Sequence, residues 1–214
     1  KIRPQNDNQS MNNPLLSQNA LPSFSAIKTE HIEPAIDNLL EDSRTILEAL
    51  LKENESYSWD NLIRPLEEKS DALSRAWSPV SHLHSVADNE ALREAYNTCL
   101  PKLIEFGTEM GQHEGLYQAY LQLQASEAFP NLHIAQKKSI GNALREFRLS
   151  GIGLDEDERE RYKNIKQEIS ALQTKFEENI LDATQDWEKH IEEEAQLAGL
   201  PTSAMALAAQ NAKA

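Results

Sequence analysis

The chain has 214 residues, of which 39% are hydrophobic and 26% are charged, and its formal net charge is −14. This length suits one domain, or one large domain with a fragment of another. An acidic surface repels phosphate backbones and anionic lipids, which argues against nucleic acid and membranes as partners. Seven glycines are few for a turn-rich β-protein, so the composition favours an all-α fold.

The chain contains a single cysteine, Cys99, which cannot form an internal disulfide. That fits a reducing compartment, so we expect a cytoplasmic protein. No apolar run approaches the roughly 18 residues of a transmembrane helix, and the N-terminal stretch lacks the apolar core of a signal peptide. Residues 1–10 are interpreted as a tail, either introduced by cloning or an upstream extension.

Residues 11–28 have no clear periodicity, and we expect an extended arm anchored by its apolar side chains. After the arm, apolar residues recur at steps of three and four, which is typical of helices with one buried face. This spacing predicts an elongated bundle of about six helices. Their expected ranges are 29–52, 58–84, 89–124 with breaks, 131–149, 155–184 and a short one after residue 202.

Several residue types mark the helix ends. Thr29 and Ser58 are expected to cap the first two helices, and Asp88 or Asn89 the third. Prolines lack an N–H and should bend or interrupt the helices that contain them. They are Pro65, Pro79 and Pro101.

The longest predicted helix begins after a glycine turn. Gly151 and Gly153 suit a chain reversal, and Asp155 can cap the helix that follows. A helix from there to about residue 183 would be roughly 40 Å long and could serve as the spine of the domain. We expect its apolar stripe to be buried, with Phe176 midway along it. The stripe comprises Tyr162, Ile165, Ile169, Leu172, Phe176, Ile180, Ala183 and Trp187.

Two further surface features precede this helix. Gly107, Gly111 and Gly115 recur every four residues and share a helix face, which would let a neighbouring helix approach closely. The helix over 131–149 carries a basic face, which we interpret as pairing with acidic neighbours rather than as a ligand site. Its basic residues are Lys137, Lys138, Arg145 and Arg148.

The six histidines do not form a recognisable metal motif. His113 and Glu114 begin like HExxH, but Tyr117 stands where the second histidine should be. His82 and His84 are two residues apart and point to different helix faces, so a metal role for that pair is the weaker reading.

The remaining reactive or aromatic residues have a structural interpretation. Cys99 lies on an apolar stripe and is expected in the core rather than as a nucleophile. The core is also the default for Trp59, Trp77 and Trp187. No catalytic or metal-binding residue is assigned, and the substrate-binding residues are unknown.

Several short motifs, taken in order and spacing, resemble the N-terminal region of the thimet-oligopeptidase family of zinc metallopeptidases. The resemblance covers nearly everything from Met11 onward. The motifs are Asn13–Leu16, Ser78–Leu83, Leu92–Tyr96, Gly111–Tyr117, Leu149–Leu154, Arg161-Tyr162, Asn179–Thr184 with Trp187, and Leu197–Pro201.

The resemblance implies a function that this stretch of chain cannot perform alone. In that family a catalytic half carries the HExxH helix and a further Glu ligand to zinc. An N-terminal helical half forms the opposing wall of a deep channel that admits short peptides and excludes folded proteins. The expected partners are therefore short peptides and the C-terminal catalytic domain of the same chain, with zinc in the full-length enzyme and no cofactor in this fragment.

This reading divides the chain into four parts. They are the tail 1–10, the arm 11–28, a helical N-terminal domain 29–192, and a truncated connector 193–214 towards the missing catalytic domain. We expect the fragment alone to be inactive. The alternative is a stand-alone helical interaction or scaffold protein, which periodicity alone does not exclude.

Overall fold

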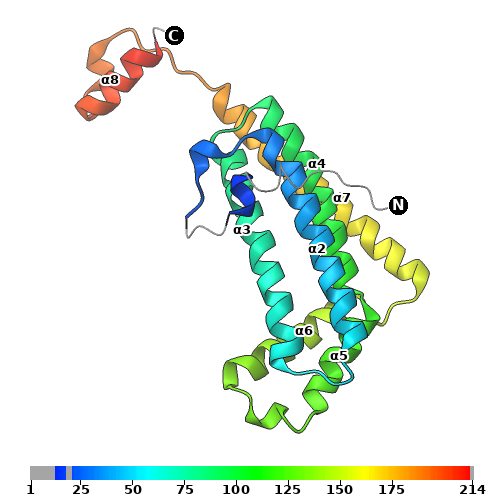
Figure 1. Cartoon of the computed structure of the whole chain (residues 1–214). Coiled ribbons are helices and arrows are strands. Elements are labelled where there is room, and N and C mark those ends of the chain that lie inside the picture. The colour runs from blue at the N-terminus through cyan, green and yellow to red at the C-terminus, as the bar shows by residue number, and fades with distance from the viewer. Residues whose placement is uncertain (1–12, 18–20, 213–214) are drawn as a thin grey trace, which may run out of the picture. The chain divides into compact units, whose positions relative to one another are not determined.

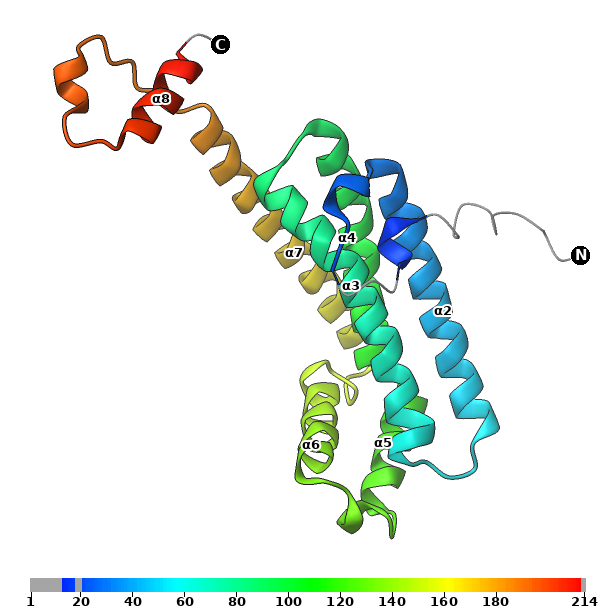
Figure 2. The same cartoon turned by 60° about the vertical axis from the view of Figure 1, so that its left-hand side comes forward.

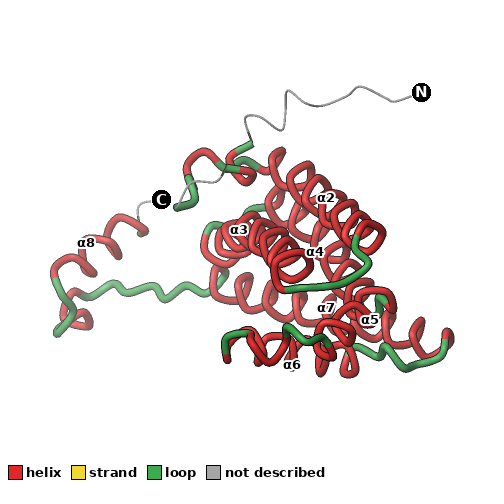
Figure 3. The backbone as a smooth tube through the Cα atoms, turned by 60° about the horizontal axis from the view of Figure 1, so that its bottom comes forward, coloured by secondary structure: helices red, strands yellow, loops and turns green. Residues whose placement is uncertain are grey.

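The computed structural model describes residues 13–17 and 21–212. The expected tail, residues 11–12 and 18–20 of the arm, and residues 213–214 of the connector lie outside the described residues. The described residues contain α-helices and shorter helical turns and no strand (Figures 1 and 3). The all-α prediction is confirmed. The α-helices are α2 (Ile32–Glu53), α3 (Arg64–Val86), α4 (Glu90–Gly111), α5 (Glu114–Ala125), α6 (Ile134–Leu149), α7 (Glu156–Gln185) and α8 (Thr202–Asn211).

The chain forms two compact units, and the boundary falls inside α7. The first unit runs through Thr174 and the second begins at Lys175. In the first, α2, α3 and α4 lie side by side, and α5 and α6 gather at one end of them (Figures 1 and 2). The second contains the end of α7, a short 3-10 helix over Glu194–Leu197, and α8.

Side-chain caps define most of the helix starts. Ser58 accepts the N–H of Asn61 at 3.1 Å and caps a π-helical segment, Trp59–Ile63, that runs directly into α3. Asn89 accepts the N–H of Leu92 at 3.1 Å at the start of α4. Asp155 accepts the N–H of Glu158 at 2.9 Å. The prediction for Thr29 is wrong, because it lies inside a 3-10 turn, Thr29–His31, that leads directly into α2.

The prolines do not end the helices that contain them. Pro65 lies in the first turn of α3, where no N–H is needed. Pro79 lies inside α3 and Pro101 inside α4, and both helices continue past them. The predicted break in 89–124 falls instead at Gln112 and His113, between α4 and α5.

Two separate clusters of buried apolar side chains form the core of the first unit. The arm-side cluster joins Leu15 of the arm to α2, α3 and α4. Its other members are Ile32, Ala35, Ile36, Leu39, Leu40, Ala76, Val80, Leu92, Tyr96 and Cys99. Leu15 and Cys99 are thus buried as the sequence predicts.

The second cluster, here the α5–α6 cluster, lies where those helices meet the end of α2 and the start of α3 (Figure 2). Its members are Leu47, Leu62, Ile63, Leu116, Ala119, Tyr120, Leu123, Ile140, Leu144, Phe147 and Ile152. Burial raises the pKa of the Tyr120 phenol to about 12.

Between the two clusters, α2 carries polar side chains that form a waist, defined here by Asp42, Ser43 and Arg44. Ser43 is buried and donates to the carbonyl of Leu39 at 2.7 Å. Arg44 forms a two-pronged pair with Glu109 of α4, at 2.9 Å from Nε to Oε2. Asp42 accepts from Lys69 of α3 at 3.2 Å. Arg44 also lies over the ring of Phe106, 5.4 Å from its centroid, so the waist combines ion pairs with an aromatic contact.

The turn between α6 and α7 closes α6 with a Schellman motif. The N–H of Ile152 donates to the carbonyl of Phe147 at 3.1 Å, and that of Gly151 to Arg148 at 3.2 Å. Gly151 has a φ of +85°, which favours glycine, so its predicted role is confirmed. Ile152 and Phe147 are both buried in the α5–α6 cluster, which fixes the turn against the core.

This turn also explains one of the three glycines spaced at four. A Cβ on Gly111 would come within 2.7 Å of the Cβ of Ser150. The side chain of Gln112 donates to the carbonyl of Ser150 at 2.9 Å, so the end of α4 and the turn are in close contact. A Cβ on Gly115 would come within 3.3 Å of Leu51 of α2, whereas Gly107 faces open space. The predicted close approach therefore holds at Gly111 and Gly115 but not at Gly107.

Two basic residues of α6, Lys137 and Arg145, have local partners. Lys137 donates to the carbonyl of Pro130 at 2.6 Å, and Arg145 lies 3.7 Å from Glu146 of its own helix. Both partners are within seven residues in the sequence. The expected pairing with a neighbouring acidic helix is not seen for these two side chains.

The largest departure from prediction concerns the apolar stripe of α7. Phe176, expected to be buried, is 66% exposed, and Trp187 is 71% exposed. Thr174 is instead the buried residue of α7, and Lys163 pairs with Glu105 of α4 at 2.5 Å. The periodicity predicts the helix correctly, but in the part of α7 through Thr174 the face that packs on the other helices of the first unit is polar.

Candidate functional site

Three histidines act as hydrogen-bond acceptors at the starts of helical segments. Nδ1 of His113 accepts the N–H of Leu116 at 3.1 Å, and Nδ1 of His133 accepts that of Ala135 at 3.2 Å. Nδ1 of His31 accepts the N–H of Lys28 at 3.1 Å. The residue that begins like HExxH, His113, is therefore the cap of α5.

The pair His82 and His84 diverges as the spacing predicts. His82 is exposed, and its ring lies 5.6 Å from that of Phe24. His84 is buried and stacks on Tyr96, with ring centroids 4.0 Å apart. Among the described residues no three His, Cys, Asp or Glu side chains gather in a way that could hold a metal ion. The donors present here therefore do not fit the zinc that the family resemblance implies.

His84 belongs to a buried cluster that joins the end of α3 to the start of α4. Asp88 lies 4.0 Å from Nε2 of His84 and accepts from Nε of Arg93 at 2.9 Å. Tyr96 is sandwiched between His84 and Trp77, whose ring is 4.8 Å away. A buried carboxylate is stable only when paired, and Arg93 supplies that charge. This cluster fixes the α3–α4 turn, and no pattern in the sequence predicts it.

Cys99 is fully buried in the arm-side cluster. Desolvation raises the pKa of its thiol to about 11, so it is protonated at neutral pH. A nucleophilic cysteine needs an accessible thiolate. The structural role predicted for Cys99 is the one that its surroundings support.

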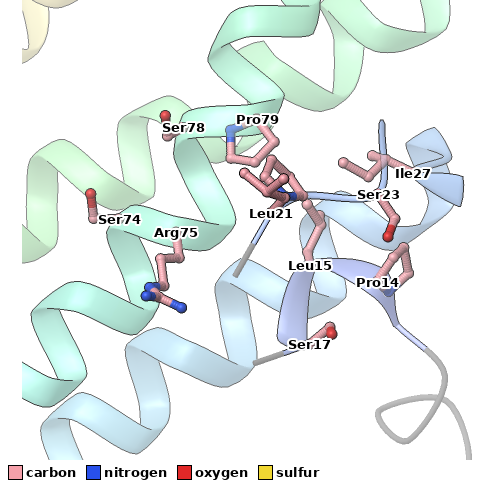
Figure 4. Close-up of a pocket in the computed structure, with 11 residues that line it drawn as sticks. Pro14, Leu15, Ser17, Leu21, Ser23, Ile27, Ser74, Arg75, Ser78 and Pro79 are labelled. Atoms are coloured by element: carbon pink, nitrogen blue, oxygen red, sulfur yellow. The ribbon is translucent and has the colours of Figure 1, made fainter. Parts of the chain in front are cut away.

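A cavity of about 280 Å³ lies between the arm and α3 (Figure 4). Leu15, Leu21 and Ile27 of the arm face Pro79, and Arg75 lies at the edge. The volume is at the small end of the roughly 300–1,000 Å³ range of ligand sites. The guanidinium of Arg75 is already paired with Asp71 at 2.9 Å. The described residues that line the cavity are a mixture of apolar side chains, serines and Arg75, and they include no pair of groups suited to acid–base or nucleophilic chemistry.

The described helices thus combine a packed scaffold with charged outer faces. None of the described helices is long and apolar enough to cross a membrane. Bond cleavage needs a positioned nucleophile, or a metal-activated water with a base. The side chains brought together here cap helices, fill cores and pair charges.

Comparison with known proteins identifies the family to which this helical chain belongs. The model of the neurolysin/thimet oligopeptidase N-terminal domain matches residues 36–159. The chain belongs to the thimet-oligopeptidase family. The matched segment begins within α2 and ends within α7, so it contains both core clusters almost whole.

The individual relatives agree with this family. Over 204 residues, 95% of this chain, it is 54% identical to oligopeptidase A of Haemophilus influenzae and 47% identical to that of Escherichia coli. It is 38% identical over 200 residues to a probable cytosolic oligopeptidase A of Arabidopsis thaliana. The resemblance read from the sequence motifs is confirmed, as the N-terminal region of this family.

The match is nearly complete for this chain but partial for the relatives. The chain spans 30% of the length of the two bacterial proteins and 28% of the plant protein. The matched model is that of an N-terminal domain, so most of each relative lies beyond the matched part.

Proposed function

We propose that this chain is the non-catalytic helical domain of a zinc-dependent oligopeptidase, in which it forms one wall of the channel that admits short peptides. The proposal rests on comparing how much of this chain matches the relatives with how much of the relatives it covers. The chain matches oligopeptidase A along almost its whole length, yet covers less than a third of that protein.

The chemistry of the described side chains also supports a non-catalytic role for this domain. Hydrolysis of a peptide bond needs a metal-activated water and a neighbouring base. His113 caps α5, and His84 is packed between helices, so neither lies in a metal-binding group. On this proposal, zinc and its ligands come from the rest of the polypeptide, and this domain helps to admit and position the substrate.

The proposed location is the cytoplasm. Its support is the single cysteine, which is buried with its thiol protonated. A chain without a disulfide is the usual form in a reducing compartment.

Reading the gene beyond Ala214 tests the proposal. An HExxH motif in the same reading frame is the expected result. A stop codon directly after Ala214 would overturn it and favour a stand-alone helical interaction protein.

A further inference from the structure

The part of α7 in the first unit has its polar side turned inward. Thr174 is buried, Gln167 and Ser170 are half-buried, and Lys163 pairs with Glu105 of α4. On the opposite face, Ile165, Ile169 and Leu172 are 44%, 47% and 60% exposed. We call these three residues the α7 stripe.

The spacing of the α7 stripe is that of a buried helix face. Single exposed apolar side chains are ordinary on protein surfaces. Large ones at i, i+4 and i+7 form a continuous ridge, which helices normally pack against another element. The same spacing continues at Phe176 and Ile180 in the second unit, where both side chains are also exposed. The packing of the first unit gives no reason for this ridge, because α7 contacts it through the other face.

We propose that the α7 stripe is the docking face for a segment of the same polypeptide that follows residue 214. This inference rests on the proposed function and names the surface that joins the two parts. Its support is that the relatives match 94–95% of this chain, while most of their own length lies beyond the match. The occupant that we propose for the stripe is therefore the remainder of the same polypeptide.

A second copy of the chain is a poorer occupant. Each copy carries a formal charge of −14, so two copies repel each other. A stable interface between separate molecules also buries about 800 Å² on each partner, far more than three side chains provide. A tethered segment needs less, because its effective concentration near the stripe is on the order of millimolar.

Thiol accessibility tests the docking directly. Leu172→Cys places a thiol on the α7 stripe, and Ile165→Cys provides a second position. The matched control is Ala171→Cys, which is exposed on the same helix but off the stripe. Cys99 is buried, so it adds little background. Each variant is treated with a thiol reagent, as the 214-residue chain and as the protein of the complete reading frame, and labelling is followed by peptide mass spectrometry.

We expect both stripe thiols to react about tenfold or more slowly in the complete protein than in the 214-residue chain. The control thiol should react at the same rate in both. Equal rates for the stripe thiols would overturn the docking proposal, and peptide hydrolysis by that complete protein would still support the proposed function. Protection without an HExxH motif in the following segment would support docking and overturn the proposed function. Protection that rises with concentration in the 214-residue chain would identify a second copy and overturn the docking proposal.

Discussion

Lys163 of α7 and Glu105 of α4 form an ion pair, with 2.5 Å between Nζ and Oε1. The pair joins the polar face of α7 to the first unit. The hydrogen bond and the charge of Lys163 lower the pKa of Glu105 from its usual 4.5. The same hydrogen bond raises the pKa of Lys163 from 10.5.

The pair should therefore stabilise the fold only over a defined pH range. A carboxyl with a lowered pKa adds stability above its unfolded value and loses it as pH falls through the folded value. Lys163→Met should lose about 0.2–1 kcal/mol at neutral pH, a small value because both side chains are exposed. Its stability should fall less steeply than that of the parent between about pH 5 and pH 3, which urea titrations at each pH would measure. Lys175→Met is the control, and an identical pH slope for the parent and Lys163→Met would contradict the prediction.

Gly151 and Gly153 flank one turn but should respond differently to alanine. Gly151 has a φ of +85°, and a Cβ there would come within 2.5 Å of Leu154. Gly151→Ala should cost about 1–3 kcal/mol of unfolding free energy. Gly153 has no such φ and faces open space, so Gly153→Ala should be close to neutral. Denaturant midpoints compare the two, and equal losses would show that the Schellman turn relaxes.

A second matched pair lies on α4. A Cβ on Gly111 would meet Ser150 at 2.7 Å, whereas one on Gly107 would meet nothing within 4 Å. Gly107→Ala should stabilise the helix by about 0.5–1 kcal/mol. Gly111→Ala should be destabilising, because Ser150 is held by the turn. Thermal melts of both variants check the sign, and stabilisation by Gly111→Ala would show that the turn moves away freely.

The exposure of α7 predicts a contrast between two apolar truncations. Leu123 is fully buried in the α5–α6 cluster, so Leu123→Ala should cost about 2–5 kcal/mol. Phe176 is largely exposed, so Phe176→Ala in the 214-residue chain should change stability by less than about 0.5 kcal/mol. Chemical denaturation measures both, and a loss of several kcal/mol at Phe176 would mean that its ring is covered in solution.

The isolated 214-residue chain should not cleave peptides or bind zinc tightly. Tyr117 stands where the second histidine of HExxH would be, and His113 is engaged as a cap. An internally quenched peptide with added zinc, beside a chelated control, provides the measurement. Turnover that is abolished by chelator and follows the chain through purification would contradict this expectation and direct attention to His82, His84 and His113.

The helices were predictable because their signals are local. Apolar spacing located α2 to α7, and Ser58 and Asp155 marked two of the starts. The sequence does not predict the histidine caps. Whether Nδ1 of His113 or His133 reaches a backbone N–H depends on the geometry of the preceding loop. The orientation of α7 was also missed, because periodicity identifies an apolar face and not the element that covers it.

The interruption of HExxH at Tyr117 is visible in the sequence, but the buried contacts of His84 are not. His84 is next to Tyr96 only because α3 and α4 fold back on each other at Asp88. Contacts of this kind join residues on separate helices and leave no pattern in a single sequence.

The polar waist of α2 has a mechanical consequence for the first unit. Interdigitated apolar side chains resist displacement, since every small shift opens a gap or a clash. Exposed ion pairs such as those of Arg44 and Asp42 tolerate small changes in length and direction at little cost. Small shifts of α2 against α3 and α4 should therefore cost less free energy at Arg44 and Asp42 than in the buried clusters on either side.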